Sequence, residues 1–489
     1  MVSGGNWTEA DVNAPGTRPG FYLNFVETAQ SVVQAGLSGI VGVLTEGDWG
    51  PPNAVTVLNS LADAAPLYSA REDTDHRIYN LIRFAFLGGA QQVKAVRVMN
   101  TDNAVKATLT LDDPSAAGII RIDAKYEGNY GNNLSVVVGD DPDDATKTRV
   151  QIYLSGVLVH SVTSTVNHGS AGFTDNVVLL LNELDSNYIT ATDLGDGDND
   201  LDDLSDTALA SGANGDAVTV TEYNAALALF QAVEVHLVST DVVSASILTA
   251  IATWADARRA EGQRLQVVLG SDTADSAATI TSDAQGFNTE SVVYVGPGAW
   301  LPNVAGVSTL YKGAQIASIV SGMIASTGQR AVTGLQLPLT TAIEAISLTT
   351  SQIKSALAGG VCLITPTPFG TTPGTKIERG LTTLYNPSGS QLPSFKLIRT
   401  VRIADAISRG LVAASVFFIG AELNDIPGQR NIIDAITRFL NTQVEARRID
   451  PNFTVVLDSA QDNSGPNLFF LVGIVPIHAV EMVFVTVEI

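Results

Sequence analysis

The chain has 489 residues, of which 45% are hydrophobic and 16% are charged, a composition that argues against wholesale disorder and fits about three domains. Its 27 Lys+Arg and 50 Asp+Glu give a formal net charge of −23. This charge excludes general binding to phosphate backbones, because such binding needs a dense basic surface. A single cysteine, Cys362, excludes intramolecular disulfides and thiolate metal clusters, and the histidines lack local metal-ligand spacing.

The N-terminal segment lacks the basic and apolar stretches of a secretory signal. The longest apolar runs, at 411–421 and 468–480, are shorter than the roughly 20 residues that span a bilayer. We therefore expect no membrane insertion, and assembly in a cytoplasm.

The first hundred residues predict strands and one helix in alternation. Residues 21–26 predict a strand after a Pro/Gly-rich arm, and the apolar run at 39–44 predicts a buried strand. Apolar side chains at helical spacing predict a helix over 75–87, which Gly88 and Gly89 end. A strand is expected at 93–98. The β-α-β order indicates a layered α/β domain.

The composition changes near residue 110. Residues 150–257 contain no Lys or Arg but 15 Asp+Glu, and alternating apolar runs at 150–154 and 156–162 predict a small antiparallel β domain. Seven aspartates lie between Asp193 and Asp206. Asp196, Asp198 and Asp200 have the spacing of a calcium loop, but Leu201 and Thr207 replace the glycine and glutamate that such a loop uses. A solvated acidic loop is predicted, and calcium binding stays open.

The α/β pattern resumes near residue 217. The pattern predicts helices at 223–232, 242–259 and 313–326, and strands at 233–238, 265–269, 291–295 and 360–364. We expect the α/β elements of 37–100 and 217–366 to form one sheet that the β domain interrupts. Such an insertion is tolerated because loop-closure entropy grows only logarithmically with length.

The last hundred residues predict two amphipathic helices, at 400–409 and 429–444, and a terminal strand at 480–489. Between Lys396 and Arg448 there are eight Lys/Arg against five Asp/Glu, so this part is mildly basic within an acidic chain.

The search for catalytic motifs gives a negative result. Residues 370–376 depart from a P-loop, 296–301 depart from a dinucleotide loop, and a G-x-S-x-G elbow is absent. Cys362 lies in an apolar run and is interpreted as a core residue, and His236 is interpreted as structural. The sequence predicts neither an enzyme nor a cofactor or metal site. The alternative is a soluble acidic α/β enzyme with an unrecognised small-molecule site at the carboxyl edge of its sheet.

The two apolar β-prone ends are the most informative feature. The terminal strand is apolar on both faces, and an unpaired strand of that kind favours aggregation. It either completes the chain's own sheet or adds to the sheet of a neighbouring subunit, which builds an open helical polymer when the contact does not close. The candidate linking residues are Phe21, Tyr22, Leu23, Phe25, Val26, Met482, Val483, Phe484, Val485, Val487 and Ile489.

Five stretches resemble the tail sheath proteins of contractile phage tails and related contractile injection systems. They are RPGFYLNF at 18–25, GIVGVLTEGDWGP at 39–51, KYEGNYGNNL at 125–134, LASGANGD at 209–216 and IVPIHAVEMVFVTV at 474–487. Ser211, Asn214 and Val480 depart from the family pattern. The five stretches occur in the family's order.

The resemblance implies a multidomain α/β fold. Residues 1–30 form an N-terminal arm with a linking strand, and 31–110 plus 216–375 form a middle layered α/β domain. Residues 111–215 form an inserted outer antiparallel β domain, and 376–489 form an inner domain with the terminal linking strand. The inner α+β domain is built from both chain ends.

The resemblance further implies a structural subunit that polymerises as stacked hexameric rings around a tail tube. Contraction of the sheath would drive the tube through the host envelope for genome ejection and cell entry. The implied partners are other copies of the chain, the tail tube protein, and baseplate and tail terminator proteins, without direct nucleic-acid contact. The implied location is the virion tail sheath. Basic side chains that could face the tube or neighbouring subunits are Arg402, Arg409, Arg430 and Arg438.

Overall fold

The computed structural model describes residues 39–72, 77–183, 188–195, 200–328, 330–368, 373–415, 419, 422–479 and 481. These residues form a mixed α/β structure with strands in six sheets. The chain divides into two compact units, one comprising residues up to 43, 81–94 and 230–489, and the other comprising 44–80 and 95–229. The helix α3 (Ile78–Leu87) and the strands β1 (Ile40–Glu46) and β3 (Gln92–Val98) each contribute residues to both units.

The first unit contains the remaining elements from residue 230 onward. They are η2 (Phe230–Ala232), β13 (Leu237–Ser239), α6 (Ala245–Ala260), β14 (Gln266–Gly270), α7 (Ala277–Phe287), β15 (Val292–Gly296), β16 (Ala299–Pro302), β17 (Ser308–Tyr311), α8 (Gly313–Thr327), β18 (Ala342–Ile343), α9 (Thr350–Ala358), β19 (Val361–Pro366), β20 (Thr375–Ile377), η3 (Pro393–Lys396), α10 (Ile398–Ser415), α11 (Ile426–Glu445), β21 (Thr454–Leu457) and β22 (Phe470–Gly473).

A largely parallel sheet is the centre of this unit. Its strand order is β2-β3-β1-β13-β14-β15-β19-β20, where β2 (Thr56–Leu58) belongs to the second unit. Strands β1, β13, β14, β15 and β19 pair in parallel, and β20 is antiparallel to β19. Strands β14 and β15 are buried along their whole length. Apolar runs bounded by glycines and helices are typical of strands that are covered on both faces.

Helix α8 packs on β13, β14 and β15, and all its residues from Gly313 to Ala325 except Gln315 are buried. Small side chains let neighbouring backbones approach it. A Cβ on Gly322 would overlap the carbonyl oxygen of Ala85 at the end of α3, and a Cβ on Gly88 would overlap that of Ile319. The glycines that end α3 therefore also permit its close packing against α8.

Most predicted strands and helices of this unit are confirmed, with shifted ends. The runs predicted at 39–44, 265–269, 291–295 and 360–364 are β1, β14, β15 and β19. The strand predicted at 233–238 was wrong in extent, because β13 begins only at Leu237 and Glu234 is exposed. The predicted single sheet is confirmed, since β1 pairs directly with β13 at Val41 and Leu237.

The second unit contains a short N-terminal part and the inserted β domain. Its elements are β2 (Thr56–Leu58), α2 (Leu61–Tyr68), β4 (Ala104–Val105), β5 (Thr108–Asp112), β6 (Gly118–Ala124), η1 (Asn129–Asn133), β7 (Leu134–Asp140), β8 (Thr148–Leu154), β9 (Val157–Thr163), α4 (Phe173–Glu183), β10 (Ile189–Asp193), β11 (Leu204–Ala208), β12 (Ala213–Asn214) and α5 (Val220–Leu229).

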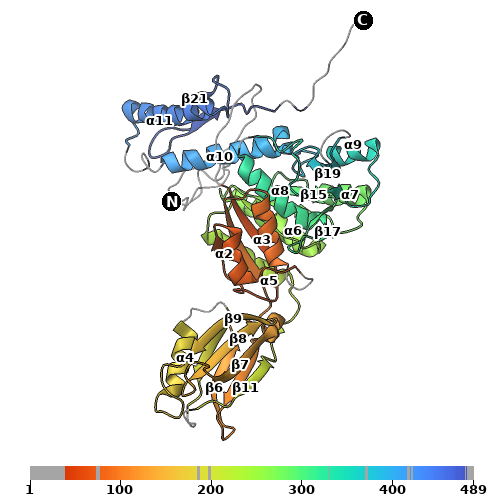
Figure 1. Cartoon of the computed structure of the whole chain (residues 1–489). Helices are drawn as coiled ribbons and strands as arrows, with labels where there is room; N and C mark the ends of the chain where they lie inside the picture. The colour runs from red at the N-terminus through yellow and green to blue at the C-terminus, as the bar shows by residue number, and fades with distance from the viewer. Residues whose placement is uncertain are drawn as a thin grey trace. The chain divides into compact units, whose positions relative to one another are not determined.

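The inserted domain has two antiparallel sheets, in the orders β10-β6-β5 and β11-β7-β8-β9. Their inner faces share one apolar core that includes Ile120, Val136 and Ile152. Helix α4 lies beside the strands of this domain (Figure 1) and packs on β10 and β9. It contributes Phe173, Val177 and Leu181 to the buried residues. The predicted antiparallel β character of this stretch is confirmed, whereas the boundaries of the four predicted domains stay a prediction.

Within the described part of the chain, every helix is too short or too polar to cross a membrane.

Candidate assembly surface

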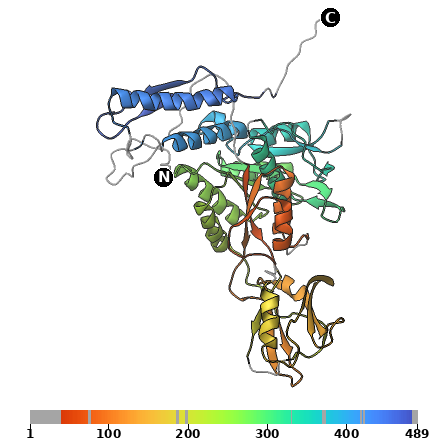
Figure 2. The same cartoon turned by 60° about the vertical axis from the view of Figure 1, so that its left-hand side comes forward.

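The last hundred residues build a small layer of two helices and one hairpin. Helices α10 and α11 lie side by side in both Figure 1 and Figure 2, and strands β21 and β22 pair antiparallel beside α11. Ile403 and Ile407 of α10 face Ile432, Ile436 and Leu440 of α11 in one buried cluster. The side chain of Asp425 accepts a hydrogen bond from the Gly428 amide at 2.8 Å, which caps the first turn of α11.

The hairpin β21–β22 covers this cluster with one face only. Val455 and Val472, which are cross-strand partners, pack against the helices. The neighbouring pair Val456 and Leu471 points the other way, and each is 48% exposed. Among the described residues, neither outer edge of this two-stranded sheet has a strand partner. An open edge with an apolar exposed face is a template for a further strand.

The chain leaves β22 along a path fixed by polar contacts. The Asp450 amide donates to the carbonyl of Val475 at 3.2 Å, and Arg399 donates to the carbonyl of Ile477. At the last described residue, Glu481 Oε2 lies 2.7 Å from Arg379 Nε and Oε1 lies 2.8 Å from Thr333 Oγ1. We call residues 474–481 the C-terminal root, because the predicted linking strand begins here.

The predicted linking residues lie outside the described residues. This holds for Phe21, Tyr22, Leu23, Phe25 and Val26 at one end, and for Met482, Val483, Phe484, Val485, Val487 and Ile489 at the other. Their role stays a prediction.

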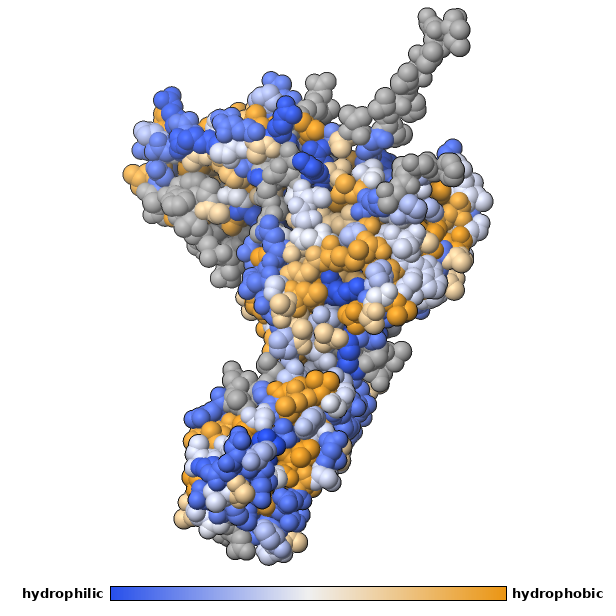
Figure 3. Space-filling model, in the orientation of Figure 1, coloured by the Kyte–Doolittle hydropathy of each residue, from blue (hydrophilic) through white to orange (hydrophobic). Residues whose placement is uncertain are grey.

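The four candidate basic residues separate into two pairs. Arg430 and Arg438 are exposed on α11, and Figure 3 shows mostly hydrophilic residues over the visible face of that helix. Arg402 is only 5% exposed, and Arg409 is partly buried and donates to the carbonyl of Arg264 at 2.6 Å. Arg402 therefore does not face outward, because its face of α10 packs into the first unit.

A buried ionic cluster that the sequence did not predict lies on that face of α10. Arg259 of α6 makes two hydrogen bonds to Asp405, at 2.8 and 3.0 Å, and both side chains are about 5% exposed. Asp405 lies between Arg402 and Arg409 in sequence, at the i, i+3, i+7 spacing of one helix face. That spacing is the signal that could have identified the cluster.

His236 belongs to the same region. It is 4% exposed, and its Nε2 lies 3.0 Å from Glu234 Oε1. Burial, together with the charge of Arg409, lowers the pKa of His236 to about 4. The interpretation of His236 as a structural residue agrees with this burial.

Three of the sequence motifs meet in the second unit, where the inserted domain begins. Trp49 is fully buried and packs edge-on against Tyr126 at 5.4 Å and Tyr130 at 5.6 Å between ring centroids. A Cβ on Gly128, whose φ is +137°, would overlap the carbonyl oxygen of Asp48. Asn214 accepts a hydrogen bond from the Asn129 amide at 2.8 Å, although it departs from the family pattern.

Arg97 ties these motifs together. Its guanidinium is fully buried and donates to the carbonyls of Gly47, Gly50 and Glu127 at 2.6, 2.8 and 2.9 Å. Burial lowers the pKa of Arg97 to about 10, and nearby Asp48 opposes that change. Because Gly47 and Glu127 lie in different motifs, this one side chain connects them.

The residues considered for chemistry have structural positions. Cys362 is fully buried in β19, where burial raises the pKa of its thiol to about 12, which confirms it as a core residue. Among the described residues, no group of three or more His, Cys, Asp or Glu is placed to hold a metal ion. Residues 196–199 of the acidic loop lie outside the described residues, and Asp200 lies 3.2 Å from His168 Nδ1.

Residues 100–228 match the family model of the phage tail sheath protein beta-sandwich domain. A sheath tail protein from Desulfitobacterium hafniense is 21% identical, with a TM-score of 0.69, and the match covers 94% of this chain and 100% of that one. One from Listeria innocua is 20% identical, with a TM-score of 0.63 and coverage of 91% and 96%.

The contracted helical sheath of the anti-feeding prophage is more distant. It is 12% identical, with a TM-score of 0.54 and coverage of 96% and 98%. None of the curated proteins compared matches the chain. The fold is that of tail sheath proteins, and the predicted resemblance to this family is confirmed for the inserted domain and for the fold of the chain.

Proposed function

We propose that the chain is a structural subunit of a contractile tail sheath. The observation that carries the proposal is the sheath fold over nearly the whole chain, together with the match of residues 100–228. In this proposal, subunits form stacked hexameric rings around a tail tube, and contraction of the sheath drives the tube through a host envelope. The alternative, an acidic α/β enzyme, has no supporting observation among the described residues.

The proposed arrangement assigns a position to each part of the subunit. The inner domain is built from both chain ends, the α/β domain lies in the middle, and the inserted β domain is outermost. Further partners are the tail tube, baseplate and tail terminator proteins. The site of assembly is the host cytoplasm, and the finished location is the tail sheath of a virion or of an injection device.

Neighbouring subunits are linked through the hairpin β21–β22. Its two open edges and the exposed pair Val456 and Leu471 support this proposal, since an added strand gains main-chain hydrogen bonds and covers apolar surface. The added strands are 21–26 and 480–489 of other copies. Contacts of this kind do not close on themselves and therefore extend into a helical polymer.

The exposed arginines Arg430 and Arg438 are proposed to face the tube or a neighbouring subunit. Individual surface ion pairs contribute only about 0–1 kcal/mol. Repeated over many subunits, such pairs hold an extended state that is still released during contraction, which is a switch between two packings of one chain.

Deletion of residues 482–489 tests the linking strand, because it keeps the C-terminal root and removes only residues of the predicted linking strand. We expect folded subunits that form no ordered sheath by negative-stain electron microscopy. The substitution Val456→Lys should have the same effect. The matched control is Val157→Lys, at a 66% exposed strand residue of the inserted domain. Normal sheaths from both the deletion and Val456→Lys would overturn the linking role.

A further inference from the structure

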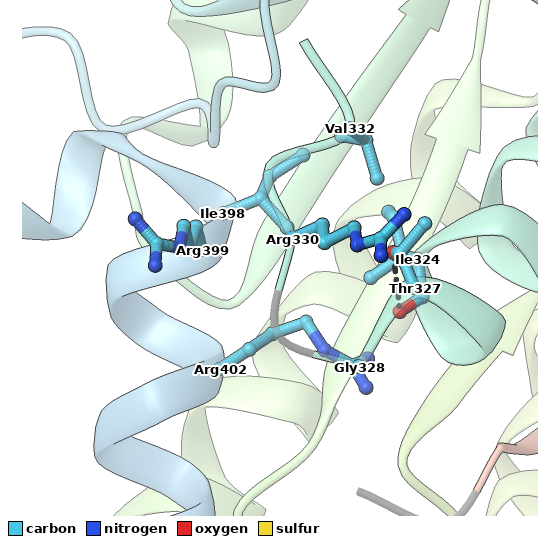
Figure 4. Close-up of a pocket in the computed structure, with 8 residues that line it drawn as sticks. All are labelled: Ile324, Thr327, Gly328, Arg330, Val332, Ile398, Arg399 and Arg402. Carbon is cyan, nitrogen blue, oxygen red and sulfur yellow. Dashed lines mark hydrogen bonds between the residues drawn. The ribbon is translucent and has the colours of Figure 1, made fainter. Parts of the chain in front are cut away.

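A pocket lined by three arginines lies in the first unit, between the end of α8 and the first turns of α10 (Figure 4). It contains about 210 Å³ of space, counted with its open mouth. None of the described residues that line it is acidic, and these residues are Ile324, Thr327, Gly328, Arg330, Val332, Ile398, Arg399 and Arg402.

Arg402 contributes a buried guanidinium that makes no ion pair within the described part of the chain. The side chain lines the pocket, and its Nε and Nη2 atoms are buried and make no hydrogen bond. The nearest carboxylate in sequence, Asp405, is engaged by two hydrogen bonds from Arg259. Burial, followed by the charge of Arg409, lowers the pKa of Arg402 to about 9. The group is still charged at neutral pH, and a buried charge without a partner costs free energy.

Arg330 and Arg399 complete the set of donors. Arg330 is exposed at the rim and makes no ion pair with a described carboxylate. Arg399 holds the carbonyl of Ile477, so the C-terminal root passes beside the pocket. On the opposite wall, Val332 precedes Thr333, whose hydroxyl donates to Glu481. The pocket is therefore adjacent to the segment from which the proposed linking strand departs.

We propose that this pocket binds the carboxylate of an Asp or Glu side chain from a second copy of the chain. Guanidinium groups bind carboxylates through charge-assisted hydrogen bonds, often two at a time. A second copy is the favoured source because each copy has 50 Asp+Glu against 27 Lys+Arg, so carboxylates are the commonest charged groups that it presents.

This inference depends on the proposed function, because it requires copies to meet. It also explains how subunits that each carry a net charge of −23 can associate, since a cationic pocket offsets part of their mutual repulsion.

The substitution Arg402→Met distinguishes a binding site from a purely structural arginine. Replacing an unpaired buried charge by an apolar side chain of similar size should leave Tm unchanged or raise it. The same substitution should lower the polymerised fraction at least about tenfold in sedimentation, for one lost charge-assisted contact. Arg330→Gln, at the exposed rim, should lower it in the same direction and does not threaten folding. Lys354→Gln, an exposed position on α9, is the matched control and should polymerise normally.

The possible outcomes distinguish a failure of the pocket proposal from a failure of the sheath proposal, and a carboxylate of a second copy from a free anion. Normal polymers from both Arg402→Met and Arg330→Gln would overturn the pocket's role while leaving the sheath proposal intact. If the wild-type chain forms no polymer, the sheath proposal fails. A titration of the unpolymerised chain with acetate at constant ionic strength then tests whether the pocket binds a carboxylate. An acetate-dependent rise in Tm that Arg402→Met abolishes supports the carboxylate site, and equal curves overturn it. A rise with inorganic phosphate at concentrations at least about tenfold lower than with acetate would assign the pocket to a free anion and overturn the second-copy source.

Discussion

Glu481 is bound to Arg379 by a 2.7 Å contact between Oε2 and Nε, while its other carboxylate oxygen accepts from Thr333. The two charged side chains are 15% and 37% exposed. This ion pair fixes the last described residue against the first unit. The position of Glu481 is therefore set by Arg379, about a hundred positions earlier in the sequence.

Glu481→Gln should loosen the C-terminal root. A partly exposed ion pair contributes up to about 1 kcal/mol, which corresponds to roughly fivefold more frequent opening. Hydrogen exchange followed by mass spectrometry should show up to about fivefold faster exchange at 474–481. Glu261→Gln, which breaks the Arg258–Glu261 pair on α6, is the control and should leave the exchange of that segment unchanged. Identical exchange in Glu481→Gln and wild type would contradict this anchoring.

Arg97→Met should destabilise the second unit by about 2–4 kcal/mol. The substitution leaves the carbonyls of Gly47, Gly50 and Glu127 buried without their donor, and an unsatisfied buried acceptor costs about 1–3 kcal/mol. The measurement is urea unfolding followed by near-UV circular dichroism, which reports on the packing of Trp49. Arg121→Met, which removes a more exposed arginine paired with Asp123, should change the midpoint little. A normal midpoint for Arg97→Met would show that the motifs hold together without it.

The sheet could be predicted from sequence because its strands are continuous apolar runs. The run predicted at 265–269 is shifted by only one residue from strand β14. The prediction is accurate because a strand covered on both faces has apolar residues at nearly every position. Helix α7 was not predicted because Thr and Ser are frequent in it and its apolar periodicity is weak. Helix α9 was also missed, although Thr349 and Gln352 form the capping box that marks its start.

The candidate site was predicted only in part. The amphipathic spacing of α10 and α11 was evident, but the orientation of Arg402 was not. Arginines usually face solvent. Only the tertiary contact between Asp405 and Arg259 shows that this face of α10 is buried. The hairpin β21–β22 was missed because its strands are four residues each and carry exposed apolar residues, which gives no clear alternation of burial in a single subunit.

Asp405→Asn should cost more stability than Arg259→Met, although both break the same ion pair. Asp405 is hydrogen-bonded to Arg259, and its charge also acts on the nearby guanidinium groups of Arg402 and Arg409, so its removal leaves Arg259 unpaired and increases the repulsion among all three. Breaking a buried pair costs about 3–5 kcal/mol, and we expect Asp405→Asn at or above that range. Arg259→Met leaves Asp405 near other arginines, so its loss of stability should be smaller than this range. Thermal unfolding of both variants measures the order, and the reverse order would contradict this account of the cluster.

The stability of the first unit should fall as the pH decreases from about 6.5 towards 4, in part because of His236. The pKa of His236 is lowered from 6.5 to about 4 by burial and by Arg409, with Arg402 acting in the same direction and Glu234 opposing them. In this interval the unfolded chain binds a proton at His236 that the folded chain does not, so the free energy of unfolding decreases with decreasing pH. The full shift corresponds to a loss on the order of 3 kcal/mol, at 1.36 kcal/mol per pKa unit. His236→Gln does not titrate and should flatten this part of the urea-midpoint profile, whereas His478→Gln, at an exposed position of the C-terminal root, should retain the wild-type slope. A wild-type slope in His236→Gln would mean that other groups account for the whole pH dependence.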